Sequence, residues 1–202
     1  ADLTSGMVYE FPELQGVIGA KYLLSEGETR EVALAVLEHY LPRGAGGALP
    51  SSEAGAVLAL VERIELLLSI YAKGDRPSGS SDPYALRRAG NGIMQILCSR
   101  GLNLDLLKVI KLSTIYWAEI LPELKIDSYS LVVELSEFLR QRIINLLEEA
   151  EIDIDLVQAV AGLDVVLEKV LVDPIDTRLR AELLMEMRQN GKLSTVQAVV
   201  TR

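Results

Sequence analysis

Two adjacent arginines, Arg87 and Arg88, are the side chains of this sequence best suited to chemistry with a ligand. They follow Asp82 and Pro83, a pair typical of a helix start, because an Asp carboxylate accepts from free N–H groups of the first turn and Pro fits its first position. We therefore predict a helix that begins at Pro83 and carries both arginines on its second turn. Guanidinium groups bind phosphate oxygens through paired hydrogen bonds, so the chemistry to be expected is recognition of a polyanion.

The sequence around the arginine pair is basic, whereas the chain as a whole is acidic. Residues 84–111 contain five Lys or Arg and one acid, Asp105, in a chain with 29 Asp and Glu, 20 Lys and Arg and a net charge of −9. Most of the surface should repel phosphates, so we expect the chain alone to bind a polyanion weakly. Successive helical residues point about 100° apart, so we expect one of Arg87 and Arg88 to pack against the fold and the other to be exposed. The alternative that both arginines are structural stays open.

The numbers of His and Cys residues give little support to a metal site or to a nucleophilic catalytic residue. The chain has one His and one Cys, whereas a transition-metal site draws on several such ligands. We expect His39 to lie at a helix C-terminus and Cys98 to be a buried apolar residue. A carboxylate-only magnesium site would have to draw on four acids, Glu10, Glu38, Glu62 and Glu65. We therefore predict no metal ligand and no catalytic residue.

Apolar residues recur at helical spacing along nearly the whole chain, and no segment alternates with a period of two. This pattern predicts an all-α fold. Loops rich in Gly and Pro at residues 41–50 and 74–79 separate helices, and the first of them lacks the Lys-Ser/Thr of a phosphate loop. We predict helix starts at Ser51 and Ser52 and, through a cap, at Asn103. One helix should bury a broad apolar face formed by Val57, Leu60, Val61, Ile64, Leu67, Leu68 and Tyr71.

The length of the chain fits one large or two small domains. A Pro-containing stretch at residues 122–128 predicts a boundary between a compact first part and a second helical segment. Residues 148–173 carry eight acids and one Lys, which favours a solvated face or a protein contact there. No apolar run approaches the roughly 18 residues of a membrane span, and no secretory signal is visible at the start. The single Cys fits a reducing compartment.

Four sequence blocks in the first 110 residues resemble the beta subunit of the bacterial-type, two-subunit glycyl-tRNA synthetase. They follow one another in the order of the family and cover residues 2–19, 38–46, 79–89 and 102–106. A weaker resemblance, still in the same order, continues through residues 154–160 and 173–176. The order and spacing of the blocks make the match specific.

The resemblance implies a compact helical domain similar to HD phosphohydrolases over residues 1–125, followed by a helical connector over residues 126–202. It implies that the whole enzyme charges glycine onto tRNA with ATP, in the cytoplasm of a bacterium or in a plastid. Adenylate chemistry, with ATP and Mg²⁺, belongs to the separate alpha subunit in that family, so no cofactor is expected in this chain. The implied partners are glycine tRNA, the alpha subunit and the remainder of the beta subunit, with no membrane.

We therefore predict a non-catalytic domain that contacts tRNA phosphates through six basic residues, Arg43, Arg87, Arg88, Arg100, Lys108 and Lys111. One alternative is a scaffold whose arginines hold neighbouring domains or the alpha subunit, with the RNA contact elsewhere. A metal-dependent HD phosphohydrolase is a less favoured alternative. No Asp follows His39, and the glutamates Glu62 and Glu65 stand where the beta-subunit pattern more often has aspartates.

Overall fold

The computed structural model describes residue 2 and residues 5–194, and this part of the chain is all-α, as predicted. No β-strand occurs among these residues, which contain one isolated bridge between Ser78 and Ser81. None of the helices described has both the length and the apolar character that a membrane span requires. In chain order the elements are α1 (Gly6–Glu10), η2 (Pro12–Leu14), α2 (Val17–Ser25), α3 (Arg30–Glu38), α4 (Glu53–Ala72), α5 (Leu86–Arg100), α6 (Leu106–Ile120), η3 (Pro122–Leu124), α7 (Ser128–Glu149), α8 (Ile154–Ala161), α9 (Glu168–Leu171) and α10 (Pro174–Gln189).

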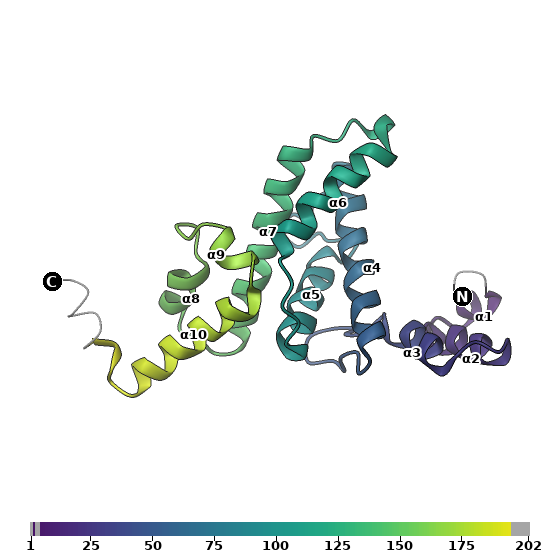
Figure 1. The fold of residues 1–202 in the computed structure, drawn as a ribbon, viewed down its shortest axis with the longest axis horizontal. Coiled ribbons are helices and arrows are strands. Elements are labelled where there is room, and N and C mark those ends of the chain that lie inside the picture. The colour runs from purple at the N-terminus through teal and green to yellow at the C-terminus, as the bar shows by residue number, and fades with distance from the viewer. Residues whose placement is uncertain (1, 3–4, 195–202) are drawn as a thin grey trace.

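The helices form an N-terminal arm, α1–α3, and a larger body, α4–α10, which follow one another along the long axis of the molecule in Figure 1. The body is organised around one hydrophobic cluster that runs from Ala56 on α4 to Ala181 on α10. Helix α5 lies deep in this cluster, since Ile93 and Leu97 are fully shielded from solvent. No described residue before Leu49 belongs to the cluster, so other contacts attach the arm to the body.

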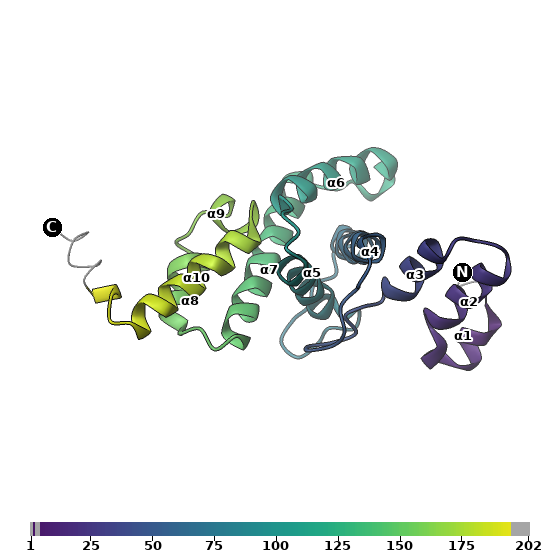
Figure 2. The same ribbon diagram turned by 60° about the horizontal axis from the view of Figure 1, so that its bottom comes forward.

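Helix α7 joins the two ends of the body and lies between α5 and the group α8–α10 in Figure 2. Its residues Leu135, Leu139, Ile143 and Leu147 are all buried in the hydrophobic cluster. The cluster therefore includes side chains from both sides of residue 125, the position at which the sequence predicts a domain boundary. The division into an HD-like domain and a connector stays a prediction.

The predicted start of α4 is confirmed, because Ser52 precedes the helix and accepts a hydrogen bond from the N–H of Gly55 at 3.0 Å. The apolar face predicted for this helix is only partly buried. Leu67 is buried as expected, whereas Val57 and Val61 are 55% and 56% exposed. These two valines lie one turn apart on the same side of α4, so part of the predicted face lacks a partner in the described chain.

The predicted cap of α6 is wrong by two residues. The helix begins at Leu106 and is capped by Asp105, whose carboxylate accepts from the N–H of Lys108 at 2.8 Å. Asn103 instead donates its side-chain amide to the carboxylate of Asp173 at 3.2 Å. Asp105 is thus the residue within reach of the first-turn N–H groups, while the Asn103 amide is engaged by a distant part of the chain.

Candidate functional site

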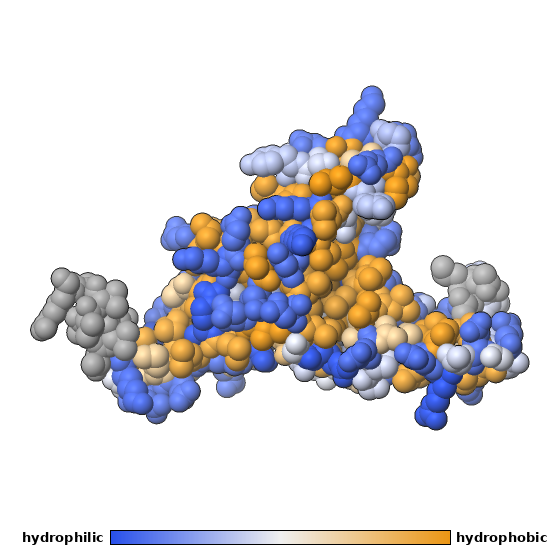
Figure 3. Space-filling model, viewed as in Figure 1, coloured by the Kyte–Doolittle hydropathy of each residue, from blue (hydrophilic) through white to orange (hydrophobic). Residues whose placement is uncertain are grey.

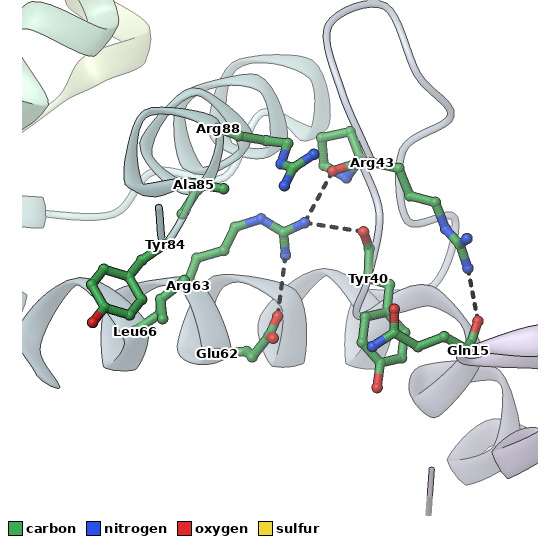
Figure 4. Close-up of a pocket in the computed structure, with 11 residues that line it drawn as sticks. Gln15, Tyr40, Arg43, Glu62, Arg63, Leu66, Tyr84, Ala85 and Arg88 are labelled. Carbon is green, nitrogen blue, oxygen red and sulfur yellow. Dashed lines mark hydrogen bonds and ion pairs between the residues drawn. The ribbon is translucent and has the colours of Figure 1, made fainter. Parts of the chain in front are cut away.

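A polar pocket of about 350 Å³ lies where the arm meets α4 and α5 (Figure 4). The turn before α2, the loop between α3 and α4, the middle of α4 and the start of α5 all contribute to its walls. Three guanidinium groups and one carboxylate line it. We call it the arginine pocket, and its lining residues are Gln15, Tyr40, Pro42, Arg43, Glu62, Arg63, Leu66, Tyr84, Ala85, Arg88 and Ala89.

The start of α5 differs from the prediction. The helix begins at Leu86 rather than Pro83, because Ala85 adopts a left-handed backbone conformation with φ 54° that interrupts the helix before it. Asp82 still caps the helix, since its carboxylate accepts from the N–H groups of Leu86 and Arg87 at 2.8 and 2.9 Å. The arginine pair therefore lies on the first turn, where Asp82 already satisfies the N–H groups of Leu86 and Arg87.

Of the three arginines that line the pocket, Arg43 and Arg88 are exposed to solvent. Arg87, which precedes Arg88 on α5 and lies outside the pocket lining, is half-buried. Figure 4 shows Arg88 reaching from α5 toward the loop that carries Arg43. Arg43 Nη2 donates to the backbone oxygen of Gln15 at 2.7 Å. Neither Arg43 nor Arg88 has a carboxylate partner within 4 Å among the residues that the structure describes. Both are therefore available to an anionic ligand.

Arg63 shapes the pocket and was absent from the predicted site residues. Its guanidinium is buried in the middle of α4, and burial lowers its pKa. It donates to the backbone oxygens of His39 at 2.9 Å, Tyr40 at 3.3 Å, Pro42 at 3.2 Å and Ala59 at 2.9 Å. Three of these acceptors lie 21 to 24 residues earlier in the chain, so Arg63 fixes the α3–α4 loop against α4. The available signal was the single basic residue of a largely apolar helix.

Glu38 and His39, from the second sequence block, both make internal contacts. The Glu38 carboxylate is buried and accepts hydrogen bonds from the N–H and hydroxyl groups of Ser51 and Ser52. Burial alone would raise the pKa of Glu38, but these four hydrogen bonds outweigh it and lower the pKa to about 2. His39 ends α3, as predicted, with Nδ1 at 2.7 Å from the backbone oxygen of Val36. Glu38 is therefore committed to holding the start of α4.

The four acids considered for a magnesium site do not gather in space. No group of three or more His, Cys, Asp or Glu side chains that could hold a metal ion occurs among residues 2 and 5–194. Cys98 is buried, as predicted, and burial raises the pKa of its thiol. A buried thiol with a raised pKa is a poor nucleophile, because the thiolate is the reactive form.

The first sequence block anchors the arm beside the pocket. Asp2 is buried, and its carboxylate accepts from the N–H groups of Gly16 and Gly19 at 2.6 and 3.0 Å. Gly16 has a φ of 84°, and a Cβ atom at this position would lie 2.9 Å from the ring of Tyr40. Burial and the neighbouring Asp2 carboxylate raise the pKa of Tyr40 to about 12. Both the backbone conformation and the ring contact therefore require glycine at position 16.

The other four predicted basic residues do not line the arginine pocket. Arg87 is close to Arg142 of α7, whose pKa is lowered by burial and by the charge of Arg87. Arg100, at the far end of α5, donates to the backbone oxygen of residue 51 at 2.9 Å. Lys108 and Lys111 are exposed on α6. Of the six predicted phosphate contacts, the structure therefore brings two to a common pocket.

Comparison with known proteins gives a consistent result along the whole chain. The family model described as glycyl-tRNA synthetase beta subunit matches residues 1–162. The glycine–tRNA ligase beta subunit of Trichodesmium erythraeum is 46% identical over 100% of this chain and 28% of the relative. Those of Acaryochloris marina and Synechocystis sp. are 42% and 38% identical, also over 100% of this chain, and over 28% and 29% of the relatives. The chain thus spans less than a third of the length of these curated relatives.

Proposed function

The chain belongs to the glycyl-tRNA synthetase beta subunit family, and on that basis we propose that it is a non-catalytic, tRNA-contacting part of a glycine–tRNA ligase. In this proposal Arg43 and Arg88 bind phosphate oxygens of glycine tRNA. The ATP-dependent step, with its Mg²⁺, takes place on the alpha subunit, so this chain needs neither. We propose, further, that the HD-like character implied by the family is one of fold and not of activity.

The observation that carries the proposal is the pair of exposed guanidinium groups in the arginine pocket. The third guanidinium, that of Arg63, is occupied by backbone oxygens, and Glu62 lies 3.7 Å from it. Arg43 and Arg88 are exposed to solvent and have no carboxylate partner in the described chain, and Arg43 uses one of its donors for the backbone oxygen of Gln15. Two such guanidinium groups suit a phosphate group, which arginine binds through paired charge-assisted hydrogen bonds.

The proposed contact uses side chains rather than the free end of a helix. Helix N-termini attract phosphates through unpaired N–H groups, but Asp82 already accepts from the N–H groups of Leu86 and Arg87 at the start of α5. Contacts of this kind position an RNA backbone without reading its sequence. We therefore assign the choice of glycine tRNA to other parts of the enzyme.

The proposal is best tested in the assembled alpha–beta enzyme, because a chain with net charge −9 should bind tRNA weakly by itself. The variant is Arg43→Ala with Arg88→Ala, and the matched control is Arg30→Ala, an exposed arginine on the arm. We expect the double variant to weaken tRNA binding about tenfold, or about 1.4 kcal/mol. The slope of log K against log salt should also fall by about 1 to 2. Unchanged affinity and slope would refute the contact.

A scaffold role is the second candidate, and it has its own supporting observation. Two sets of contacts join the arm to the body. Glu38 at the end of α3 accepts from the N–H groups of Ser51 and Ser52 before α4, and Arg63 of α4 donates to the backbone oxygens of His39 and Tyr40. Arg88→Ala separates the two roles, since the Arg88 side chain makes no ion pair with a described residue. Lower thermal stability or impaired subunit assembly with unchanged tRNA affinity would favour the scaffold.

A further inference from the structure

Exposed apolar side chains gather on the opposite flank of α4 from the arginine pocket. They line a groove of about 400 Å³ between α4 and α6. We call it the apolar groove. Its main residues are the exposed Val61, the half-buried Ile64 and the buried Leu68 of α4, and the exposed Leu112, Tyr116 and Ile120 of α6. Tyr116 and Ile120 are 66% and 65% exposed. Figure 3 shows apolar surface over α4 and along α6 on the face that it displays.

The sequence of both helices produces this groove. On α6, Leu112, Tyr116 and Ile120 are spaced four residues apart, and on α4 the groove residues Val61 and Leu68 are two turns apart. Residues at these spacings share one face of a helix, so each helix presents an apolar stripe. The two stripes face one groove, and no described segment of the chain fills it.

The chemistry of the groove favours a permanent protein partner over RNA. Glu65 is the one charged residue of its lining, and it is acidic. A surface for nucleic acid would be basic and largely polar, because phosphate contacts dominate such interfaces. Permanent interfaces between protein segments are instead the most apolar class, and they resemble a domain core cut in half.

We propose that a segment of the same beta-subunit polypeptide, outside these 202 residues, covers the apolar groove. The relatives carry more than two thirds of their length beyond the part that this chain matches. A segment on the same polypeptide has a high effective concentration at the groove, which a separate subunit lacks. A groove between two helices suits a third, amphipathic helix with large apolar side chains. Charge complementarity places a Lys or Arg of that helix opposite Glu65.

Thiol labelling in the full-length beta subunit tests this proposal. Ile120→Cys places a thiol in the groove, and Ile154→Cys is the matched control, because Ile154 is 68% exposed at a helix end outside the groove. Labelling by a maleimide is followed at each site by peptide mass spectrometry. If the groove is covered in roughly nine molecules out of ten, the Ile120→Cys thiol reacts about tenfold more slowly than the control. The labelling rate of Tyr116→Cys provides a second, independent measurement in the same groove.

The expected protection is present in the beta subunit alone and does not change with its concentration. Equal labelling rates at the two positions would overturn the proposal. Protection that appears only after the alpha subunit is added would assign the groove to that subunit instead. Protection that grows with beta-subunit concentration would assign it to a second copy.

Discussion

Helix α4 carries two surfaces of opposite chemistry on its two flanks. Glu62 and Arg63 line the arginine pocket, whereas Val61 and Ile64 line the apolar groove. The polar flank is largely satisfied from within, since Arg63 donates to four backbone oxygens of the described chain. The apolar flank has no such partner among the residues that the structure describes. The difference indicates that the pocket is formed before any ligand arrives, while the groove depends on another segment for its completion.

The largest effect should come from breaking the polar flank. Arg63→Met removes four hydrogen bonds and leaves buried backbone oxygens without a donor, which we expect to cost about 4 kcal/mol of unfolding free energy. For a chain of this size the melting temperature should fall by about 8–16 °C. Arg88→Met, on the exposed side of the same pocket, is the control and should change stability by less than about 0.5 kcal/mol. Equal losses in the two variants would contradict the assigned roles.

The next effect concerns the pH dependence of the contact between the arm and α4. The pKa of Glu38 is lowered from 4.5 to about 2 in the folded chain, so its ionised form stabilises the fold above about pH 4.5. That contribution, about 2–3 kcal/mol, should be lost as the pH falls from about 4.5 toward 2. Urea unfolding at about pH 6 and about pH 3 measures it. Glu38→Gln should shrink the difference between the two pH values, and an unchanged difference would disprove the coupling.

The smallest effect should appear on the apolar flank. Val57 and Val61 lie one turn apart on α4 with nearly equal exposure, but only Val61 lines the groove. In the full-length beta subunit, Val61→Ser should cost about 1 kcal/mol more unfolding free energy than Val57→Ser, because burial by a covering segment would add to its cost. Chemical denaturation of the two variants measures the difference. Equal losses of unfolding free energy in the two variants would indicate that no segment covers the groove.

The sequence predicted the local parts of this structure well. The all-α fold, the start of α4 at Ser52 and the burial of Cys98 all follow from periodicity, capping chemistry and composition. Arg88 is exposed and Arg87 is half-buried, as expected for adjacent residues that point about 100° apart on a helix. These features depend on a few neighbouring residues, so a single sequence carries enough information to find them.

The parts that could not be predicted depend on backbone conformation or on distant partners. Nothing in the side chain of Ala85 indicates a left-handed residue, and that residue moves the start of α5 from Pro83 to Leu86. The role of Arg63 depends on backbone oxygens more than 20 residues away, which no sequence pattern reveals. The exposure of Val61 likewise depends on where α6 packs and not on α4 itself.

The four consecutive residues 61–64 of α4 serve both surfaces, because the outer two line the apolar groove and the inner two line the arginine pocket. This arrangement restricts how the helix can evolve. Each residue of a helix is turned by about 100° from the one before it. A single codon lost between Ser52 and Val61 would rotate every later side chain by that angle and bring Glu62 to the place of Val61 in the groove, whereas a codon gained would bring Arg63 to the place of Ile64. The surfaces can therefore change by substitution, one residue at a time, but the length of the first part of α4 should be fixed across descendants of this gene.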